Sequence, residues 1–193
     1  MPKILEYIGS ENGVEINTTS LCFPNYAIID HLQKGLVQKV IASKPFKYVI
    51  TQQGPSSQAA GKSMLETDGA KLKQLADKHN ATLGYFMVWP SKRYYFTFDK
   101  VIENHTNAAQ KNNALLFAVG KVWKQYNTFK SLENLYDYDE FHPSKAGSFL
   151  AALTIFHQLH PTKKLHLLPH SPYKKWVKDE VSFRKIIALV IQQ

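Results

Sequence analysis

An aspartate and a histidine three residues apart are the strongest chemical signal in this sequence. Asp139 precedes His142, and Pro143-Ser144 then leads into a long apolar stretch. A carboxylate at this spacing can orient an imidazole, which can then take a proton from a nucleophile. Asp137 is a competing partner at a less usual spacing, and Asp139 can instead be an acidic residue that stabilises the following helix N-terminus. The pair predicts the acid–base half of a hydrolytic triad.

Side-chain amides in two loops are candidates for binding a developing oxyanion. Gln52 and Gln53 follow a compact apolar segment, 46–51. An amide beside a dry cleft can donate to such an oxygen, and Gln52 is the preferred residue. Both glutamines can equally be turn residues that satisfy loop backbone. Asn25, with the backbone around it, is a further candidate donor.

Aromatic residues follow a third apolar segment, 82–89. Trp89, Tyr94 and Tyr95 can wall a substrate pocket, although a loop that packs on the sheet edge explains them at least as well. Four histidines near the C-terminus have no carboxylate or cysteine at ligand spacing, so they predict no metal site: His157, His160, His166 and His170. No dinucleotide or phosphate-loop motif is present, and we expect no cofactor.

Short apolar runs alternate with helical stretches up to residue 159. Strands are expected at 14–22, 46–51, 82–89 and 115–119. Helices are expected at 4–8, 28–42, 65–79, 98–112, 120–126, 143–159 and 181–191. This alternation is typical of a three-layer α/β/α sandwich with a mostly parallel sheet. The ligand site of such a sheet lies beyond the carboxyl ends of its strands, where the candidate loops occur.

Length and composition are those of a globular domain. The chain has 193 residues, of which 44% are hydrophobic, and Cys22 is its only cysteine, so no intrachain disulfide can form. No apolar run has membrane-spanning length, and residues 1–7 do not resemble a signal peptide. The sequence leaves both the compartment and the oligomeric state open.

Positive charge is concentrated after residue 159. Of the net charge of +9, seven basic residues less Asp179 and Glu180 place +5 in this tail. The basic residues are Lys163, Lys164, Lys174, Lys175, Lys178, Arg184 and Lys185. Because bases and aromatics do not interleave along one element, a solvated basic surface is favoured over nucleic-acid binding. We therefore expect a domain at 1–159 with a basic extension, 160–193, packed on it.

Four segments together resemble the SGNH hydrolase superfamily, the GDSL-type esterases and lipases, over roughly residues 1–159. Asp139, His142, Pro143 and Ser144 match its last block, and 48–53 resembles the third block of a branch with glutamine after the strand. Residues 84–90 resemble that branch's next strand. Residues 23–26 stand where the second block normally has a glycine, which is absent here.

The resemblance implies a flavodoxin-like sheet and hydrolysis of an acyl ester, on a carbohydrate or a lipid. His142 would be the base, Asp139 its orienting partner and Gln52 an oxyanion donor. The family's nucleophile block, a strand ending in Gly-Asp-Ser or Gly-Asn-Ser, has no counterpart. Ser10 is too close to Asn25 and is interpreted as a helix-end residue. We therefore expect the first, internal strand to be missing and the natural protein to be longer.

Two other functions follow from the same residues. A non-catalytic module on this fold would hold a sugar or an acyl group near Gln52, Trp89 and Tyr94, and the absent nucleophile favours it. A binder of anionic surfaces would use the basic tail and would lose affinity in salt. For the hydrolase and for the non-catalytic module, the expected partner is a small ester or glycan. We expect no nucleic-acid partner and no membrane span.

Overall fold

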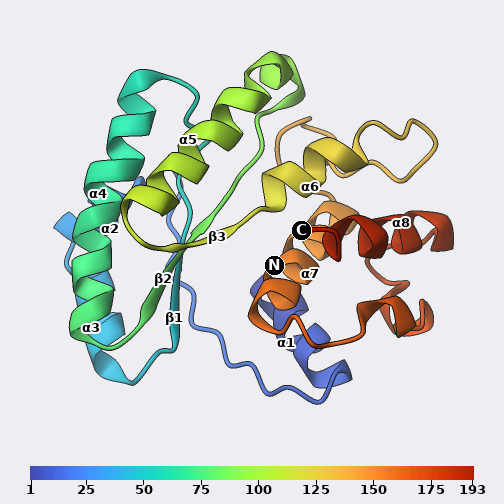
Figure 1. The fold of residues 1–193 in the computed structure, drawn as a ribbon, viewed down its shortest axis with the longest axis horizontal. Coiled ribbons are helices and arrows are strands. Elements are labelled where there is room, and N and C mark those ends of the chain that lie inside the picture. Colours follow the sequence, from blue (N-terminus) through green and yellow to red (C-terminus); the bar gives the residue numbers. More distant parts are fainter. The chain divides into compact units, whose positions relative to one another are not determined.

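All residues from Met1 to Gln193 are described by the structure, a computed structural model (Figure 1). They divide into two units, each described by itself. The helical unit comprises Met1–Ser20, Ser91–Arg93 and Ala118–Gln193. The sheet unit comprises Leu21–Pro90 and Tyr94–Phe117. The chain passes between the units four times, and one of these points lies within a short 3₁₀ helix, Lys92–Thr97.

Three parallel strands form the only sheet. They are β1 (Tyr48–Thr51), β2 (Thr82–Phe86) and β3 (Leu115–Phe117), in the order β1-β2-β3. Each run is rich in β-branched, aromatic or leucine residues, and each is followed by a loop or a helix. The mixed α/β class and the parallel sheet predicted from the sequence are confirmed.

Four helices accompany the sheet in its unit: α2 (Ile28–Gln33), α3 (Leu36–Ser43), α4 (Ala59–Lys78) and α5 (Phe98–Lys111). Helix α4 packs on α2, α5 and β2, and α5 also contacts β3. The connections between parallel strands are thus helical, as a crossover requires.

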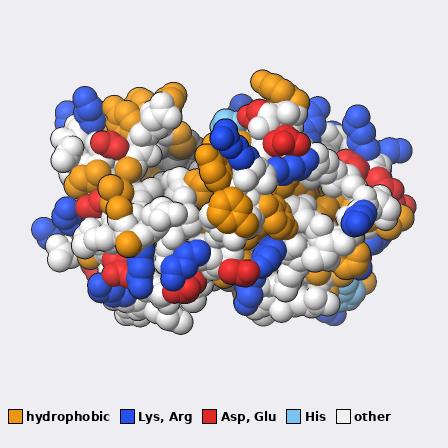
Figure 2. Space-filling model, turned by 90° about the horizontal axis from the view of Figure 1, so that it is seen from above, with side chains coloured by type: hydrophobic (Ala, Val, Ile, Leu, Met, Phe, Trp, Pro, Cys, Tyr) orange, Lys and Arg blue, Asp and Glu red, His pale blue; other side chains and the backbone are white.

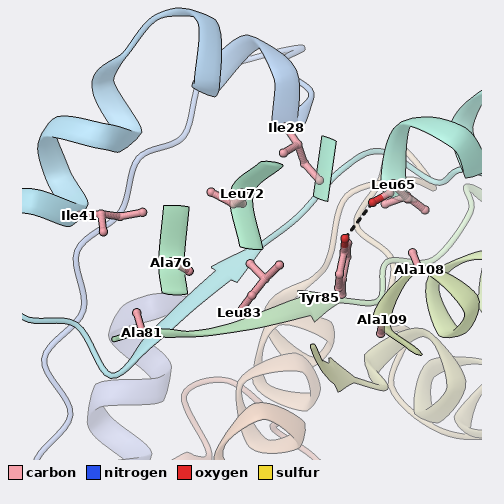
Figure 3. Close-up of a cluster of buried hydrophobic side chains, with 10 residues drawn as sticks. All are labelled: Ile28, Ile41, Leu65, Leu72, Ala76, Ala81, Leu83, Tyr85, Ala108 and Ala109. Atoms are coloured by element: carbon pink, nitrogen blue, oxygen red, sulfur yellow. Dashed lines mark hydrogen bonds between the residues drawn. The ribbon is translucent and has the colours of Figure 1, made fainter. Parts of the chain in front are cut away.

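The core of the sheet unit lies between one face of β2 and these helices (Figure 3). Leu83 and Tyr85, two residues apart on the strand, point to the same face because side chains alternate. The other buried members are Ile28, Ile41, Leu65, Leu72, Ala76, Ala81, Ala108 and Ala109. The buried Tyr85 hydroxyl donates to Leu65 O at 2.8 Å, so this polar group is satisfied.

Four helices make up most of the helical unit: α1 (Pro2–Glu11), α6 (Val119–Tyr126), α7 (Lys145–Leu159) and α8 (Glu180–Val190). Helix α7 contacts each of the other three. Every residue from Phe149 to Phe156 is buried. A helix that is apolar all round has to be covered all round, which explains why α7 is the central element of this unit.

One predicted strand is wrong. Residues 14–22 form no strand, and the alternating Val14, Ile16 and Thr18 are held by α1 instead. Val14 N donates to Gly9 O at 2.9 Å, while both the backbone N–H and the hydroxyl of Thr18 donate to the Glu6 carboxylate, at 2.9 and 2.6 Å. Side-chain and turn hydrogen bonds thus satisfy an extended segment that has no neighbouring strand.

One predicted helix is two helices. The stretch 28–42 breaks between α2 and α3 at Gly35, whose φ of 70° lies in the left-handed region that glycine adopts without strain. The remaining predicted helices and strands are present, with shorter strands at 82–86 and 115–117 and an earlier start for α4.

The basic tail packs within the helical unit. It forms two 3₁₀ helices, Leu165–Leu167 and Ser171–Tyr173, and then α8, which contacts α6 and α7. The domain boundary expected at residue 159 stays a prediction.

Several of the tail's basic side chains have partners within the fold. Lys163 Nζ donates to Asn12 O at 2.7 Å, and Arg184 Nη1 donates to Leu168 O at 2.7 Å. Lys175 Nζ lies 3.6 Å from the Tyr7 ring centroid. On the face shown in Figure 2, basic and acidic side chains are scattered among each other. These observations favour the solvated basic surface over a nucleic-acid groove.

Candidate functional site

The Asp-His hairpin, residues 135–144, is a tight turn that immediately precedes α7. Ser144 N donates to Leu135 O at 2.8 Å, and Asp137 N donates to His142 O at 2.8 Å. Glu140 N closes the tip by donating to Asp137 O at 3.0 Å. These backbone bonds fix the conformation of the segment that carries the predicted base and its carboxylate.

Asp139 and His142 are brought together. Asp139 Oδ2 lies 2.5 Å from His142 Nδ1, and Asp139 Oδ1 accepts the backbone N–H groups of His142 and Phe141 at 2.9 and 3.0 Å. A carboxylate at Nδ1 favours the tautomer that carries its proton there, so Nε2 presents its lone pair. The side chains are 69% and 33% exposed for His142 and Asp139, so the base can be reached from solvent.

The alternatives for these two aspartates are now distinguishable. Ser144, not Asp139, caps α7, because its hydroxyl accepts from Gly147 N at 3.1 Å. The Asp137 carboxylate accepts from Tyr138 N at 2.9 Å rather than from the imidazole. Asp139 is therefore the partner of His142 in geometry, while the catalytic role of the pair stays a prediction.

The pKa of Asp139 is lowered to about 2. The largest cause is the hydrogen bond from the His142 side chain, and the two backbone N–H groups contribute next. Because this pKa is lowered, the contact stabilises the fold at pH values above the ordinary pKa of 3.8. That stabilisation is lost as the pH falls from 3.8 toward 2. We expect His142→Ala to move the pKa of Asp139 back toward 3.8. A titration followed by ¹³C NMR of the carboxyl carbon measures this.

Asp179 is the internal control for that titration. Its pKa is also lowered, by the hydroxyl and the backbone N–H of Ser182, which do not involve His142. Asp179 should titrate identically in both proteins. An Asp139 pKa that does not change in His142→Ala would show that the imidazole is not what keeps this carboxyl ionised.

Two residues that position the hairpin were missed in the sequence. Lys92 Nζ pairs with the Glu140 carboxylate at 3.2 Å, and Lys92 N donates to Glu140 O at 3.0 Å. Glu140 has a φ of 58°, an uncommon value for a residue with a side chain. Strained residues often mark functional turns, but nothing in the local sequence identifies this one.

The predicted oxyanion donors belong to the sheet unit. Gln52 is exposed and makes no hydrogen bond to another residue. Gln53 is buried, and its Oε1 accepts from Ile28 N at 3.3 Å, which satisfies one of the free N–H groups at the start of α2. Gln53 thus satisfies backbone of helix α2 rather than of its own loop, whereas Gln52 keeps a free amide. Their roles in binding an oxyanion stay predictions.

Asn25 has a left-handed backbone conformation. Its φ is 62°, in the left-handed region that asparagine tolerates better than most residues. The residue is exposed and its backbone N–H has no partner in the structure. A role of this N–H in binding an oxyanion stays a prediction.

A buried amide fixes the loop that carries Gln52. Asn104 Nδ2 donates to Ser56 O at 2.8 Å, and the Ser56 hydroxyl donates to Gly54 O at 2.9 Å. Both Asn104 and Ser56 are buried, so this contact is costly to leave unmade. No local pattern predicts this contact, because an asparagine within a helix is usually a surface residue.

The three aromatic candidates differ in their surroundings. Trp89 is only 8% exposed and meets the Phe86 ring edge-on at 6.2 Å, as a packing residue would. Tyr95 meets the buried Phe98 edge-on at 5.1 Å, while Tyr94 is exposed. A substrate-binding role for Trp89 stays a prediction.

No group of three or more His, Cys, Asp and Glu side chains in the structure could hold a metal ion. The four histidines at 157–170 instead have separate surroundings: burial lowers the pKa of His157, and His170 Nε2 is 2.7 Å from Val177 O. None of the helices combines the length and the apolar character needed to cross a membrane.

Comparison with known proteins finds similarity at the level of the fold. No protein-family model matches the sequence, and no curated protein is significantly similar to it. A DUF4886 family protein from Bacteroides uniformis superposes with a TM-score of 0.78 at 14% identity, over 100% of this chain and 88% of that one.

A second solved structure carries a functional description. This protein from Slackia heliotrinireducens, described as "a putative SGNH hydrolase", superposes with a TM-score of 0.66 at 22% identity, over 82% of this chain and 90% of that one. At these identities the similarity concerns the fold alone. With the parallel sheet and helices described above, it shows that the chain shares the α/β fold of these two proteins.

Proposed function

We propose that the chain carries the acid–base half of a serine-type ester hydrolase. The observation that carries this proposal is the contact between Asp139 Oδ2 and His142 Nδ1 at 2.5 Å, on a hairpin that leaves the imidazole exposed. Two backbone N–H groups also donate to the carboxylate and fix its position, so the carboxylate can orient the imidazole ring. The SGNH-like fold supports the proposal as an analogy.

The chemistry assigned to the pair is acyl transfer in two steps. His142 Nε2 removes the proton from a serine hydroxyl as its oxygen attacks the ester carbonyl, and a tetrahedral oxyanion forms. Collapse expels the alcohol, which takes that proton from Nε2, and leaves an acyl-serine. Water, deprotonated by the same nitrogen, then attacks the acyl carbonyl. The acyl–serine bond breaks, the serine oxygen takes that proton from Nε2, and the carboxylic acid is released. Asp139 stabilises the imidazolium at both steps without being protonated itself.

The proposal assigns oxyanion donation to the sheet unit. The Gln52 amide and the Asn25 backbone N–H are the candidate donors, because neither group is engaged by another residue. Gln53 has a supporting role through its bond to Ile28 N. The substrate is assigned only as an acyl ester, on a carbohydrate or a lipid.

The nucleophile is assigned to an upstream strand. Within its unit, His142 Nε2 has no hydroxyl or thiol partner. The sheet has an open edge at β1 that a further strand would fill. On the side toward β2, Lys47 O accepts from Thr82 N at 2.9 Å. Because peptide groups alternate along a strand, those of Tyr48 and Ile50 face away from β2. The proposal is that the natural protein carries a serine-bearing strand before Met1 that pairs there.

The mass and N-terminal sequence of the protein made by its own cell test this assignment. A mass clearly above 22.1 kDa, with a Gly-x-Ser strand ahead of Pro2, is the expected result. A native protein of 22.1 kDa that begins at Met1 would contradict it.

A non-catalytic ligand-binding module is the second candidate, favoured by the lack of a nucleophile on His142 Nε2. Its signature is a ligand that raises the unfolding temperature and is recovered unchanged. Release of an acid or an alcohol from that ligand would decide for the hydrolase instead.

A further inference from the structure

Two aromatic rings on the Asp-His hairpin are exposed on either side of the candidate carboxylate. Tyr138 is 93% exposed, the highest value of any large apolar or aromatic residue in the chain, and Phe141 is 40% exposed. The Phe141 ring meets the His142 ring edge-on at 5.0 Å. An aromatic residue left this exposed beside a candidate base contributes nothing to the core, so its ring is available for contact with a ligand.

The rings stand on a rigid support. The backbone bonds of the hairpin fix the chain on both sides of its tip, and both the main chain and the side chain of Lys92 hold Glu140. Tyr138 N is itself held by the Asp137 carboxylate at 2.9 Å. A ring displayed on a fixed backbone loses little conformational entropy when it binds, which makes it an effective contact.

The charge of the hairpin restricts what the rings can bind. Residues 137–142 contain Asp137, Asp139 and Glu140 and no lysine or arginine, and the nearby Lys92 is already paired with Glu140. Phosphate backbones and anionic lipid headgroups would be repelled. A long acyl chain would need a continuous apolar surface, whereas here carboxylates alternate with the rings. A neutral ligand with hydroxyl groups and an apolar face fits this pattern.

We propose that Tyr138 is a specificity-determining residue that stacks on a sugar ring of a neutral carbohydrate, next to His142. The axial C–H groups of a pyranose form an apolar face that packs on an aromatic ring. Its hydroxyls can donate to the carboxylates of Asp137 and Glu140, which alternate with the rings along the hairpin. The position of an ester bond beside His142 rests on the proposed function. The binding of a carbohydrate by Tyr138 does not.

Isothermal titration calorimetry of the full chain tests the binding. The probes are neutral β-linked oligosaccharides of glucose, xylose and N-acetylglucosamine with four to six units. At least one should bind, and Tyr138→Ala should weaken that binding about tenfold. Tyr138→Phe, which keeps the ring, should bind nearly as well as the parent. Leu167→Ala, which removes another exposed apolar side chain of the helical unit, should bind unchanged.

Three results would overturn the proposal. One is no binding across the panel, and another is binding that Tyr138→Ala leaves unchanged. The third is binding that depends on Tyr138 but is seen only with vesicles of anionic phospholipid or with a single-stranded RNA. The titration involves no bond breaking, so its outcome does not depend on whether His142 acts as a base. Carbohydrate binding can therefore be found even if the hydrolase assignment fails. The hydrolase assignment can likewise hold if no carbohydrate binds.

Discussion

His142→Ala is expected to slow covalent labelling of the natural protein by a fluorophosphonate about a thousandfold. This reagent needs no knowledge of the substrate: an activated serine oxygen attacks phosphorus and fluoride leaves. Activation depends on a base whose Nδ1 is held by Asp139 at 2.5 Å, so removal of the imidazole leaves the serine with its ordinary weak nucleophilicity. The time course of labelling, read by intact mass, measures the effect.

His166→Ala is the matched control for that variant. His166 is exposed in the same unit and lies in the 3₁₀ helix Leu165–Leu167, outside the Asp-His hairpin. Its labelling rate should equal that of the parent. Equal rates for the parent and His142→Ala would show that His142 is not the base.

Gly147→Ala should destabilise the fold by about 3 kcal/mol, among the largest effects expected of a single methyl group. A Cβ at this position would lie 2.3 Å from Leu135 O and 2.6 Å from a ring carbon of Trp123. Trp123 is fully buried, and Leu135 O is fixed by the bond from Ser144 N, so neither can move without loss. Urea unfolding followed by circular dichroism measures the change.

Gly54→Ala is the comparison for a methyl group without a clash. No atom lies within 4 Å of its Cβ position, and its backbone is outside the left-handed region. The free energy of unfolding should change by no more than about 0.5 kcal/mol. If both variants unfolded at the same urea concentration, the close approach of α7 to the Asp-His hairpin would be refuted.

The pairing of Asp139 with His142 could be predicted because it is local. Both residues lie in one short turn, and three residues of chain suffice to bring a carboxylate to an imidazole. The contacts that hold the hairpin and the Gln52 loop could not be predicted, because they join residues that are far apart in the sequence. Lys92 and Glu140 are 48 residues apart, as are Ser56 and Asn104, and no pattern within a window reports such partners.

The errors in the fold have a similar origin. Alternation at 14–18 predicts a strand, but a strand also needs a neighbour, and here Glu6 and Gly9 of α1 satisfy the segment instead. The break at Gly35 did have a local signal, since glycine within a helical pattern often marks an end. The continuous apolar periodicity on both sides of it outweighed that signal.

The discontinuity of the helical unit bears on how the chain folds during synthesis. All segments of the sheet unit lie between Leu21 and Phe117, so this unit is complete while later residues are still being made. Helix α7 packs on α1 from one end of the chain and on α8 from the other. Its buried residues cannot be covered before translation reaches Val190. The nascent chain thus carries a finished sheet while α1 waits for its partners, and during that interval the apolar surface of α7 is open to chaperones or to aggregation.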